Sequence, residues 1–160
     1  MRFGFFTAVA CFAVGAVVAA SGPPVDVVAR TKGASRIVVG KVTSVEPGRF
    51  DVNEFGDRLI YTRAWVEVEE TLKGSAQNLV AVDVEGGTAG DMRLEVSDME
   101  PLRQGDRAVL FLNAERNGAH APNGRGNGVL KLDSTNRVKN DTNLTLSDLK
   151  VKVRSAAKAK

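Results

Sequence analysis

Apolar and polar side chains alternate in short stretches along much of the chain, which is typical of strands with one buried face. Segment 59–71 is the longest example. The positions predicted to face the core are Ile60, Thr62, Ala64, Val66 and Val68. The positions predicted to face water are Leu59, Tyr61, Arg63, Trp65, Glu67 and Glu69. Alternation, or runs of β-branched and other apolar residues, predict further strands over residues 36–45, 79–84, 92–96, 108–112 and 129–133.

Helical signals lie only at the two ends of this strand-rich region. Pro24 and Gly33 bracket a short helix over 25–32. Ser147 is placed to cap a C-terminal helix whose buried positions would be Leu149, Val153 and Ala156. The pattern therefore predicts an all-β fold, a small barrel or sandwich with short N- and C-terminal helices. Gly40 predicts a bulge in the first strand, and segments 46–56 and 113–127 are predicted to be loops.

The first twenty residues are predicted to be a signal peptide rather than part of the fold. Arg2 precedes an uncharged apolar run over 3–18, and small residues follow it up to Ala20. The run is shorter than the roughly twenty residues that span a bilayer. The alternatives are a membrane anchor and a lipoprotein attached through Cys11. We expect export to the periplasm or the cell exterior, with no stable membrane anchor after cleavage.

The expected organisation follows from these boundaries. Residues 1–20 are the signal peptide, 21–34 a linker and short helix, 35–137 the β-barrel domain, and 138–160 the C-terminal helix and basic tail. The only cysteine falls in the signal peptide, so the mature domain would contain no thiol.

Composition excludes several kinds of chemistry. One Cys and one His cannot supply a Cys/His zinc site or a disulfide scaffold. A net charge of +3 is low for a protein that binds duplex nucleic acid. His120, in a small polar loop without a neighbouring nucleophile motif, is predicted to be an exposed loop histidine. We expect no catalytic residues, no metal and no cofactor, although oxygen ligands over 51–57 leave Ca²⁺ as an alternative.

Tyr61, Arg63 and Trp65 are the most distinctive surface positions, because their alternation places all three on the water face of the long strand. Aromatic side chains beside an arginine bind sugars, peptides or single-stranded nucleic acid by stacking. The alternative is that a helix, such as the C-terminal one, covers Trp65.

Four segments resemble the netrin-like domain of the tissue inhibitors of metalloproteinases. They are the strand Ser35–Val42 with its Arg-Ile-Val-Val-Gly core, the turn Glu69–Gly74, the valine strand with its Gly86-Gly87 loop, and Pro101–Leu112. The resemblance implies an OB-fold, a five-stranded closed barrel with flanking helices. Those inhibitors chelate the zinc of the protease with an N-terminal cysteine. Here the predicted mature chain begins at Ser21, so that chelating group is absent.

The function expected from these observations is an exported, non-enzymatic OB-fold module that binds a protein partner. Its binding surface would combine Ser21 with the loop residues Glu85, Gly86, Gly87 and Thr88. A secreted protease is one possible partner, which makes a metalloprotease inhibitor an alternative. The other alternative is an oligosaccharide or single-strand nucleic-acid binder that uses Tyr61, Arg63 and Trp65.

Overall fold

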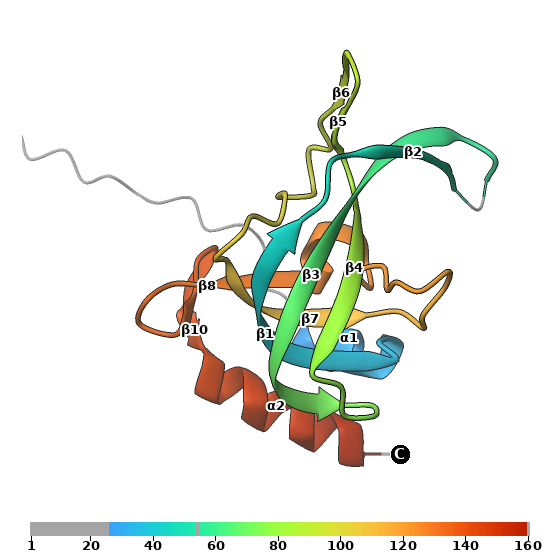
Figure 1. Ribbon diagram of the computed structural model, residues 1–160. Coiled ribbons are helices and arrows are strands. Elements are labelled where there is room, and N and C mark those ends of the chain that lie inside the picture. The colour runs from blue at the N-terminus through green and yellow to red at the C-terminus, as the bar shows by residue number, and fades with distance from the viewer. Residues whose placement is uncertain (1–25, 54, 160) are drawn as a thin grey trace, which may run out of the picture.

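The longest strand, β3, organises the sheet of this protein (Figure 1). The computed structural model describes residues 26–53 and 55–159, so Ser21 and the predicted signal peptide lie outside the described residues. Its strands are β1 (Arg36–Val45), β2 (Arg49–Val52), β3 (Arg58–Lys73), β4 (Leu79–Glu85), β5 (Gly87–Ala89), β6 (Met92–Leu94), β7 (Arg107–Leu112), β8 (Val129–Leu132), β9 (Arg137–Val138) and β10 (Asp141–Thr145). The helices are α1 (Val27–Gly33), the 3-10 turn η1 (Arg125–Gly128) and α2 (Leu146–Lys158). The expected all-β class is confirmed.

Eight strands form one antiparallel sheet in the order β10-β9-β8-β7-β1-β3-β2, with β4 also paired to β3. Both β1 and β2 pair with one edge of β3, while β4 pairs with the other edge. Tyr61 of β3, for example, has Arg49 of β2 on one side and Glu85 of β4 on the other. β5 and β6 form a separate hairpin. The predicted bulge in the first strand is confirmed by a register shift between Val39 and Gly40.

The expected closed five-stranded barrel is wrong, because the sheet is open and has more strands. Among residues 26–53 and 55–159, β4 pairs with no strand other than β3. Instead, the 119–123 segment lies between β4 and β7 and is joined to each by isolated β-bridges, Val82 with His120 and Leu112 with Pro122. The His120 amide donates to the Ala81 carbonyl at 2.8 Å, and the Asn123 amide donates to the Phe111 carbonyl at 2.7 Å. Irregular backbone therefore stands where a closing strand was expected.

Two strands are buried on both faces and separate two apolar cores. β1 and β7 direct Val39 and Phe111 to one core and Val38 and Leu110 to the other. The first core lies between the sheet and the two helices, and the second combines the buried residues of β3 and β4 with Met99 and Leu102. Burial on both sides explains why β1 and β7 read as continuous apolar runs rather than alternating ones.

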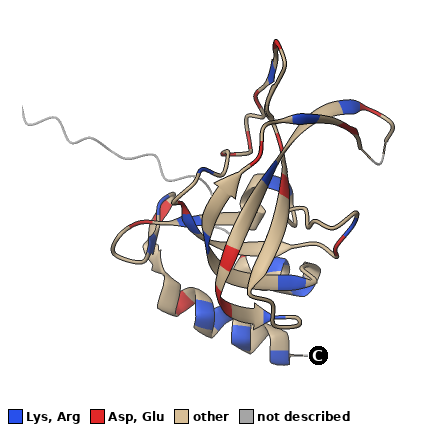
Figure 2. Cartoon of the chain, viewed as in Figure 1, with Lys and Arg blue, Asp and Glu red and all other residues tan. Residues whose placement is uncertain are grey.

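The helices close one side of the first core. α1 lies in the predicted region but begins two residues later than expected, at Val27, with the Asp26 carboxylate accepting from the Ala29 amide at 2.9 Å as its N-cap. α2 buries Leu149, Val153 and Ala156 as predicted, but its N-cap is Thr145 in a capping box with Asp148, not Ser147. Lys and Arg residues are distributed along α2 (Figure 2). One of them, Arg154, pairs with Glu70 of β3 at 2.8 Å. Within residues 26–53 and 55–159, no helix is long and apolar enough to cross a membrane.

Strands lie in two regions where none was predicted, the expected loop 46–56 and the region 137–145, most of which was assigned to the C-terminal helix and tail. The 46–56 segment includes β2, which extends the β1 edge of β3 beyond the break at Pro47-Gly48. After β8 the chain adds β9 and β10 before α2, so the sheet continues to Thr145. Each of these strands is five residues or shorter, too short for alternation to distinguish it from a polar loop.

Candidate functional site

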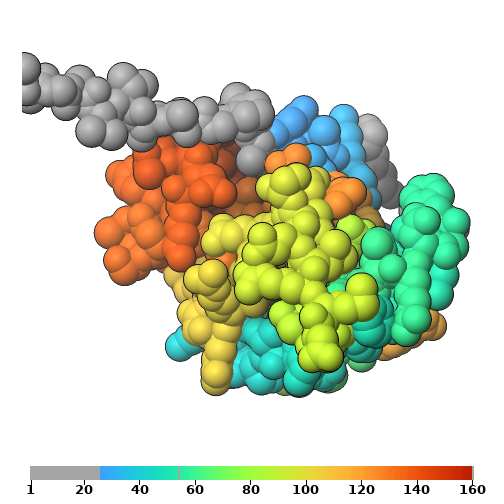
Figure 3. Space-filling view, turned by 90° about the horizontal axis from the view of Figure 1, so that it is seen from above, coloured from blue at the N-terminus to red at the C-terminus, as the bar shows by residue number. Residues whose placement is uncertain are grey.

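Two hairpins project from the same end of the molecule (Figures 1 and 3). We call β2 with the first residues of β3 the arm (residues 49–53 and 55–61), and β5 with β6 the hairpin (87–94); together they form the rim. Seven large apolar side chains among the described residues are exposed, and four of them lie on the rim: Phe50, Val52, Phe55 and Met92. Phe55 is 80% exposed and Met92 61%. The Phe50 ring lies beneath the Arg58 guanidinium, whose Cζ is 4.3 Å from the ring centroid.

The predicted loop residues Glu85–Thr88 form the turn that carries the hairpin. Gly86 and Gly87 have φ angles of +110° and +116°, a region that side-chain-bearing residues rarely adopt. The Thr62 hydroxyl donates to the Gly86 carbonyl at 2.6 Å, and a Cβ on Gly87 would lie 2.1 Å from that same hydroxyl oxygen. This segment is therefore fixed to β3 rather than being a flexible loop.

A first cavity of about 780 Å³, the inner cavity, lies beneath the hairpin. Its floor consists of residues of the second core, including Ala64, Val84 and Leu102. Its other lining residues include the predicted Glu85, Gly86, Gly87 and Thr88, together with Arg93 and Arg103. An apolar floor with polar groups at the opening is the composition of many ligand pockets.

A second cavity of about 600 Å³, the outer cavity, lies between the arm and the 113–125 segment. Its polar lining includes Arg49, Tyr61, Arg63, Asp83, His120 and Arg125. Glu85 and Met99 line both cavities. The Glu85 carboxylate pairs with Arg125 at 3.1 Å, so this ion pair stands where the two cavities adjoin.

Asp83 is the electrostatic centre of the outer cavity. Its carboxylate accepts from Arg63 Nε at 2.8 Å and Nη2 at 2.9 Å, and from Arg49 Nη2 at 2.6 Å. Burial raises the pKa of Asp83, but the hydrogen bonds from Arg63 and Arg49 outweigh it and hold the pKa below its usual value of 3.8. The same pair raises the pKa of Arg63. Burial, followed by the nearby Glu85 and Asp51 carboxylates, raises the pKa of Tyr61, so its phenol stays protonated at neutral pH.

An Asp83→Asn variant is expected to lose about 2 kcal/mol of unfolding free energy at neutral pH, because two part-buried guanidinium groups lose their shared counter-charge. Since the folded-state pKa is lowered, the stabilisation is present above the usual aspartate pKa and is lost as the pH falls through the folded value. The variant should therefore lose less stability than the native protein on acidification below about pH 4. Urea unfolding at several pH values measures both effects.

Asp51→Asn is the matched control for this prediction. Asp51 lines the same cavity, but its carboxylate is half-exposed and lies 3.9 Å from Arg49. The control should change stability by less than about 0.5 kcal/mol. Equal losses in the two variants would contradict the central role of Asp83.

His120 is buried, so its expected exposure in a loop is wrong. The residue is only 5% exposed, and its Nδ1 lies 2.8 Å from the Asn113 carbonyl oxygen. Its backbone bridges to β4 through the Ala81 carbonyl and the Asp83 amide. The burial of His120 could not be predicted from the polar sequence around it, because the two backbone hydrogen bonds to β4 do not belong to a regular strand with alternating residues.

The predicted stripe of Tyr61, Arg63 and Trp65 is divided in the structure. Tyr61 and Arg63 line the outer cavity, whereas Trp65 lines neither cavity. The Trp65 indole N–H donates to Glu46 at 2.6 Å, and the Arg63 guanidinium is held by Asp83. α2 contacts β3 through ion pairs at Glu70. The hydrogen-bond partner of the Trp65 indole is Glu46, which does not belong to that helix.

Arg49, Asp83 and His120 were not among the predicted site residues. One signal for Asp83 was present, because it is an acidic residue between valines at a position that faces outward beside Arg63. Within residues 26–53 and 55–159, no group of three or more His, Cys, Asp or Glu residues is placed to hold a metal ion.

No protein-family model and no curated protein matches the chain in sequence.

Proposed function

We propose that the protein is an exported, non-enzymatic binding module that engages a protein partner through the rim. One observation carries the proposal: exposed apolar side chains lie on two projections at one end of the molecule (Figure 1), with Val52 and Phe55 on the arm and Met92 on the hairpin. Apolar clusters of this kind are typical of protein interaction sites. The inner cavity beneath the hairpin offers an apolar floor for a side chain of the partner.

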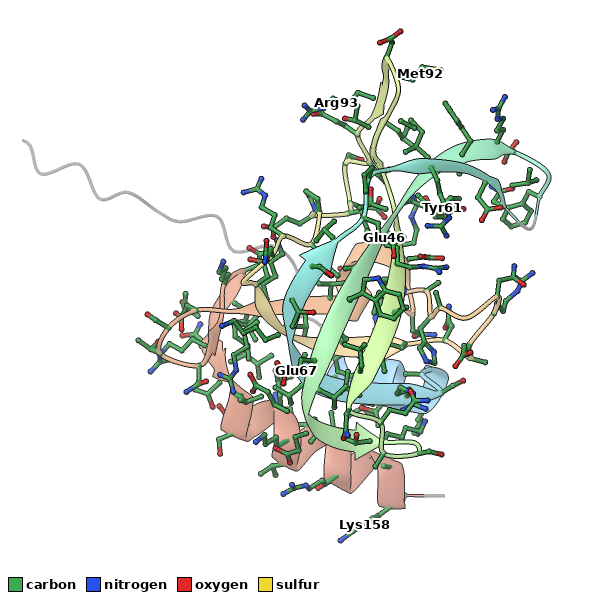
Figure 4. The ribbon with its side chains drawn as sticks, viewed as in Figure 1. Glu46, Tyr61, Glu67, Met92, Arg93 and Lys158 are labelled. Atoms are coloured by element: carbon green, nitrogen blue, oxygen red, sulfur yellow. The ribbon has the colours of Figure 1, made fainter. Side chains whose placement is uncertain are left out.

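The sequence supports the same proposal in two ways. The loop residues Glu85–Thr88, which the netrin-like resemblance singles out, form the base of the hairpin and line the inner cavity. A secreted protease is the class of partner that this resemblance implies. Figure 4 shows Met92 and Arg93 on the hairpin and Tyr61 beneath the arm, on the side of the sheet.

Site-specific photo-crosslinking tests the proposal. A photoreactive phenylalanine analogue is placed at Phe55 or Met92 in the full-length protein, expressed in its native host. Because both positions would lie in the interface, irradiation should give the same adduct from each, and mass spectrometry should identify one exported protein in both adducts.

Val151 provides the matched control, because it is an apolar residue on α2 with 63% exposure, close to that of Met92. Placed there, the analogue should give no adduct with that protein. The proposal fails if the adduct from position 151 is the same, if positions 55 and 92 give none, or if the only adduct is a second copy of this chain. An exported metalloprotease in the adducts would favour inhibition as the consequence of binding.

A further inference from the structure

Two of the polar atoms buried without a partner belong to the outer cavity. Among the described residues, three buried side-chain nitrogen atoms make no hydrogen bond: Arg36 Nε, Arg49 Nη1 and His120 Nε2. Arg49 and His120 both line the outer cavity. Folded proteins leave few buried polar atoms unpaired, since each costs about 1–3 kcal/mol. A molecule that supplied an acceptor to one and a donor to the other would remove both costs.

The hydrogen-bonding role of His120 follows from its neighbour. The Asn113 carbonyl can only accept, so His120 Nδ1 carries a proton. In the neutral ring Nε2 is then an acceptor, and its nearest charged neighbour is Glu115 at 3.9 Å, beyond hydrogen-bond distance. His120 therefore requires a donor such as a hydroxyl group.

Arg49 has the opposite requirement. Its Nη2 is bound to Asp83 at 2.6 Å, which fixes the guanidinium plane and leaves Nη1 as a donor without an acceptor. The Tyr61 phenol lines the same cavity and stays protonated, so it can both donate and accept. The cavity therefore combines a donor, an acceptor and a group that can do either.

The charges of the cavity wall disfavour an ion. Its basic residues are Arg49, Arg63, Arg116 and Arg125, and its acidic residues are Asp51, Asp83 and Glu85. Three of these arginines are already paired with the acidic residues. The lining also contains Phe55 and Pro122, which provide apolar surface. A volume of about 600 Å³ suits a ligand of one to a few rings.

We propose that the outer cavity is a binding site for a short neutral saccharide. Sugar hydroxyls can donate to His120 Nε2 and accept from Arg49 Nη1, and the C–H face of a pyranose ring can lie against the apolar part of the wall. This differs from the stacking surface expected from Tyr61, Arg63 and Trp65, because Trp65 lies outside the cavity. The site shares the arm with the protein interface proposed for the rim, because Arg49, Phe55 and Tyr61 line the cavity, but it includes no residue of the hairpin.

Calorimetric titration of the mature protein tests the site. The probes are N-acetylglucosamine, chitotriose, cellotriose and maltotriose, with inorganic phosphate and citrate as anions, each at about 10 mM. At least one saccharide should bind with a Kd below about 1 mM. A Tyr61→Phe variant should bind it about tenfold more weakly, because it removes one hydroxyl from the lining of the cavity.

Trp65→Phe is the matched control, since Trp65 lies on the same face of β3 but outside the cavity. It should leave the affinity unchanged. The proposal is overturned if no saccharide binds, if an anion binds more tightly than every saccharide, or if Tyr61→Phe has no effect. An equal loss in Trp65→Phe would also overturn it, in favour of the strand surface. Photo-crosslinking from Met92 should be unchanged in Tyr61→Phe, which separates this site from the rim.

Discussion

A Gly40→Ala substitution is expected to lower the free energy of unfolding by about 3 kcal/mol. Gly40 lies in β1 between β3 and β7, opposite Val68 on one side and Ala108 on the other. A Cβ at this position would lie 2.6 Å from the Glu67 carbonyl oxygen and 2.6 Å from Val66 Cγ1. The carbonyl belongs to the neighbouring strand, so relieving the clash requires β1 and β3 to separate locally.

Gly105→Ala is the matched control. Gly105 lies in a turn with φ of +89°, and a Cβ there would meet no atom within 4 Å. The cost of alanine at Gly105 is therefore conformational alone, about 1 kcal/mol. Urea unfolding of both variants measures the difference. If Gly105→Ala proved as destabilising as Gly40→Ala, the close approach of β1 and β3 could not be the cause.

The glycine at position 40 shows what local sequence can predict. A glycine inside a run of β-branched residues predicts an irregularity in a strand, and one of the three register shifts between β1 and β3 lies at that residue. The inward positions of β3 were predictable for the same reason, since Ile60, Ala64 and Val66 follow a period of two and are buried. These features depend on neighbours along the chain, so a single sequence contains the information.

The bridges between the 119–123 segment and the sheet, and the outer cavity, depend on contacts between distant segments. The backbone of His120 replaces a strand beside β4, and nothing in its small polar loop indicates that position. Asp83 binds Arg49 and Arg63, which precede it by 34 and 20 residues. A partner for Arg63 could be expected on a neighbouring strand, but its identity depends on the register between β3 and β4. Alternation predicts the face of the sheet on which each side chain lies, but it does not predict which residue of β4 lies opposite a given residue of β3.

Register also places the one buried lysine among the described residues. Lys131 of β8 is only 5% exposed. Its ammonium donates to the Glu100 carboxylate at 2.9 Å and to the Pro101 carbonyl at 2.7 Å, and it pairs with Asp106 at 2.8 Å. Pro101 lines the inner cavity, as do the next two residues of the chain. Lys131 thus attaches one wall of the inner cavity to the sheet.

Lys131→Met is expected to destabilise the protein by about 3–4 kcal/mol at neutral pH, because the methionine retains most of the volume but leaves the Asp106 carboxylate without its counter-charge. Burial raises the pKa of Asp106, and the hydrogen bond from Lys131 is the main contribution that holds it below 3.8 in the native protein. A lowered folded-state pKa stabilises above the usual aspartate pKa, and that stabilisation is lost as the pH falls through the folded value. The gap between native protein and variant should therefore narrow below about pH 4.

Lys152→Met is the matched control, since Lys152 is exposed on α2, and it should change stability by less than about 0.5 kcal/mol. A difference in unfolding free energy between the native protein and Lys131→Met that stays constant from neutral to acid pH would contradict the part assigned to Asp106.

The position of Lys131 also predicts which segment of the variant unfolds locally. Because its ammonium holds the 100–106 segment, limited proteolysis of Lys131→Met should cut there first, whereas a loss confined to β8 would expose the 129–138 segment instead. Cleavage within 100–106 would show that the wall of the inner cavity depends on this lysine.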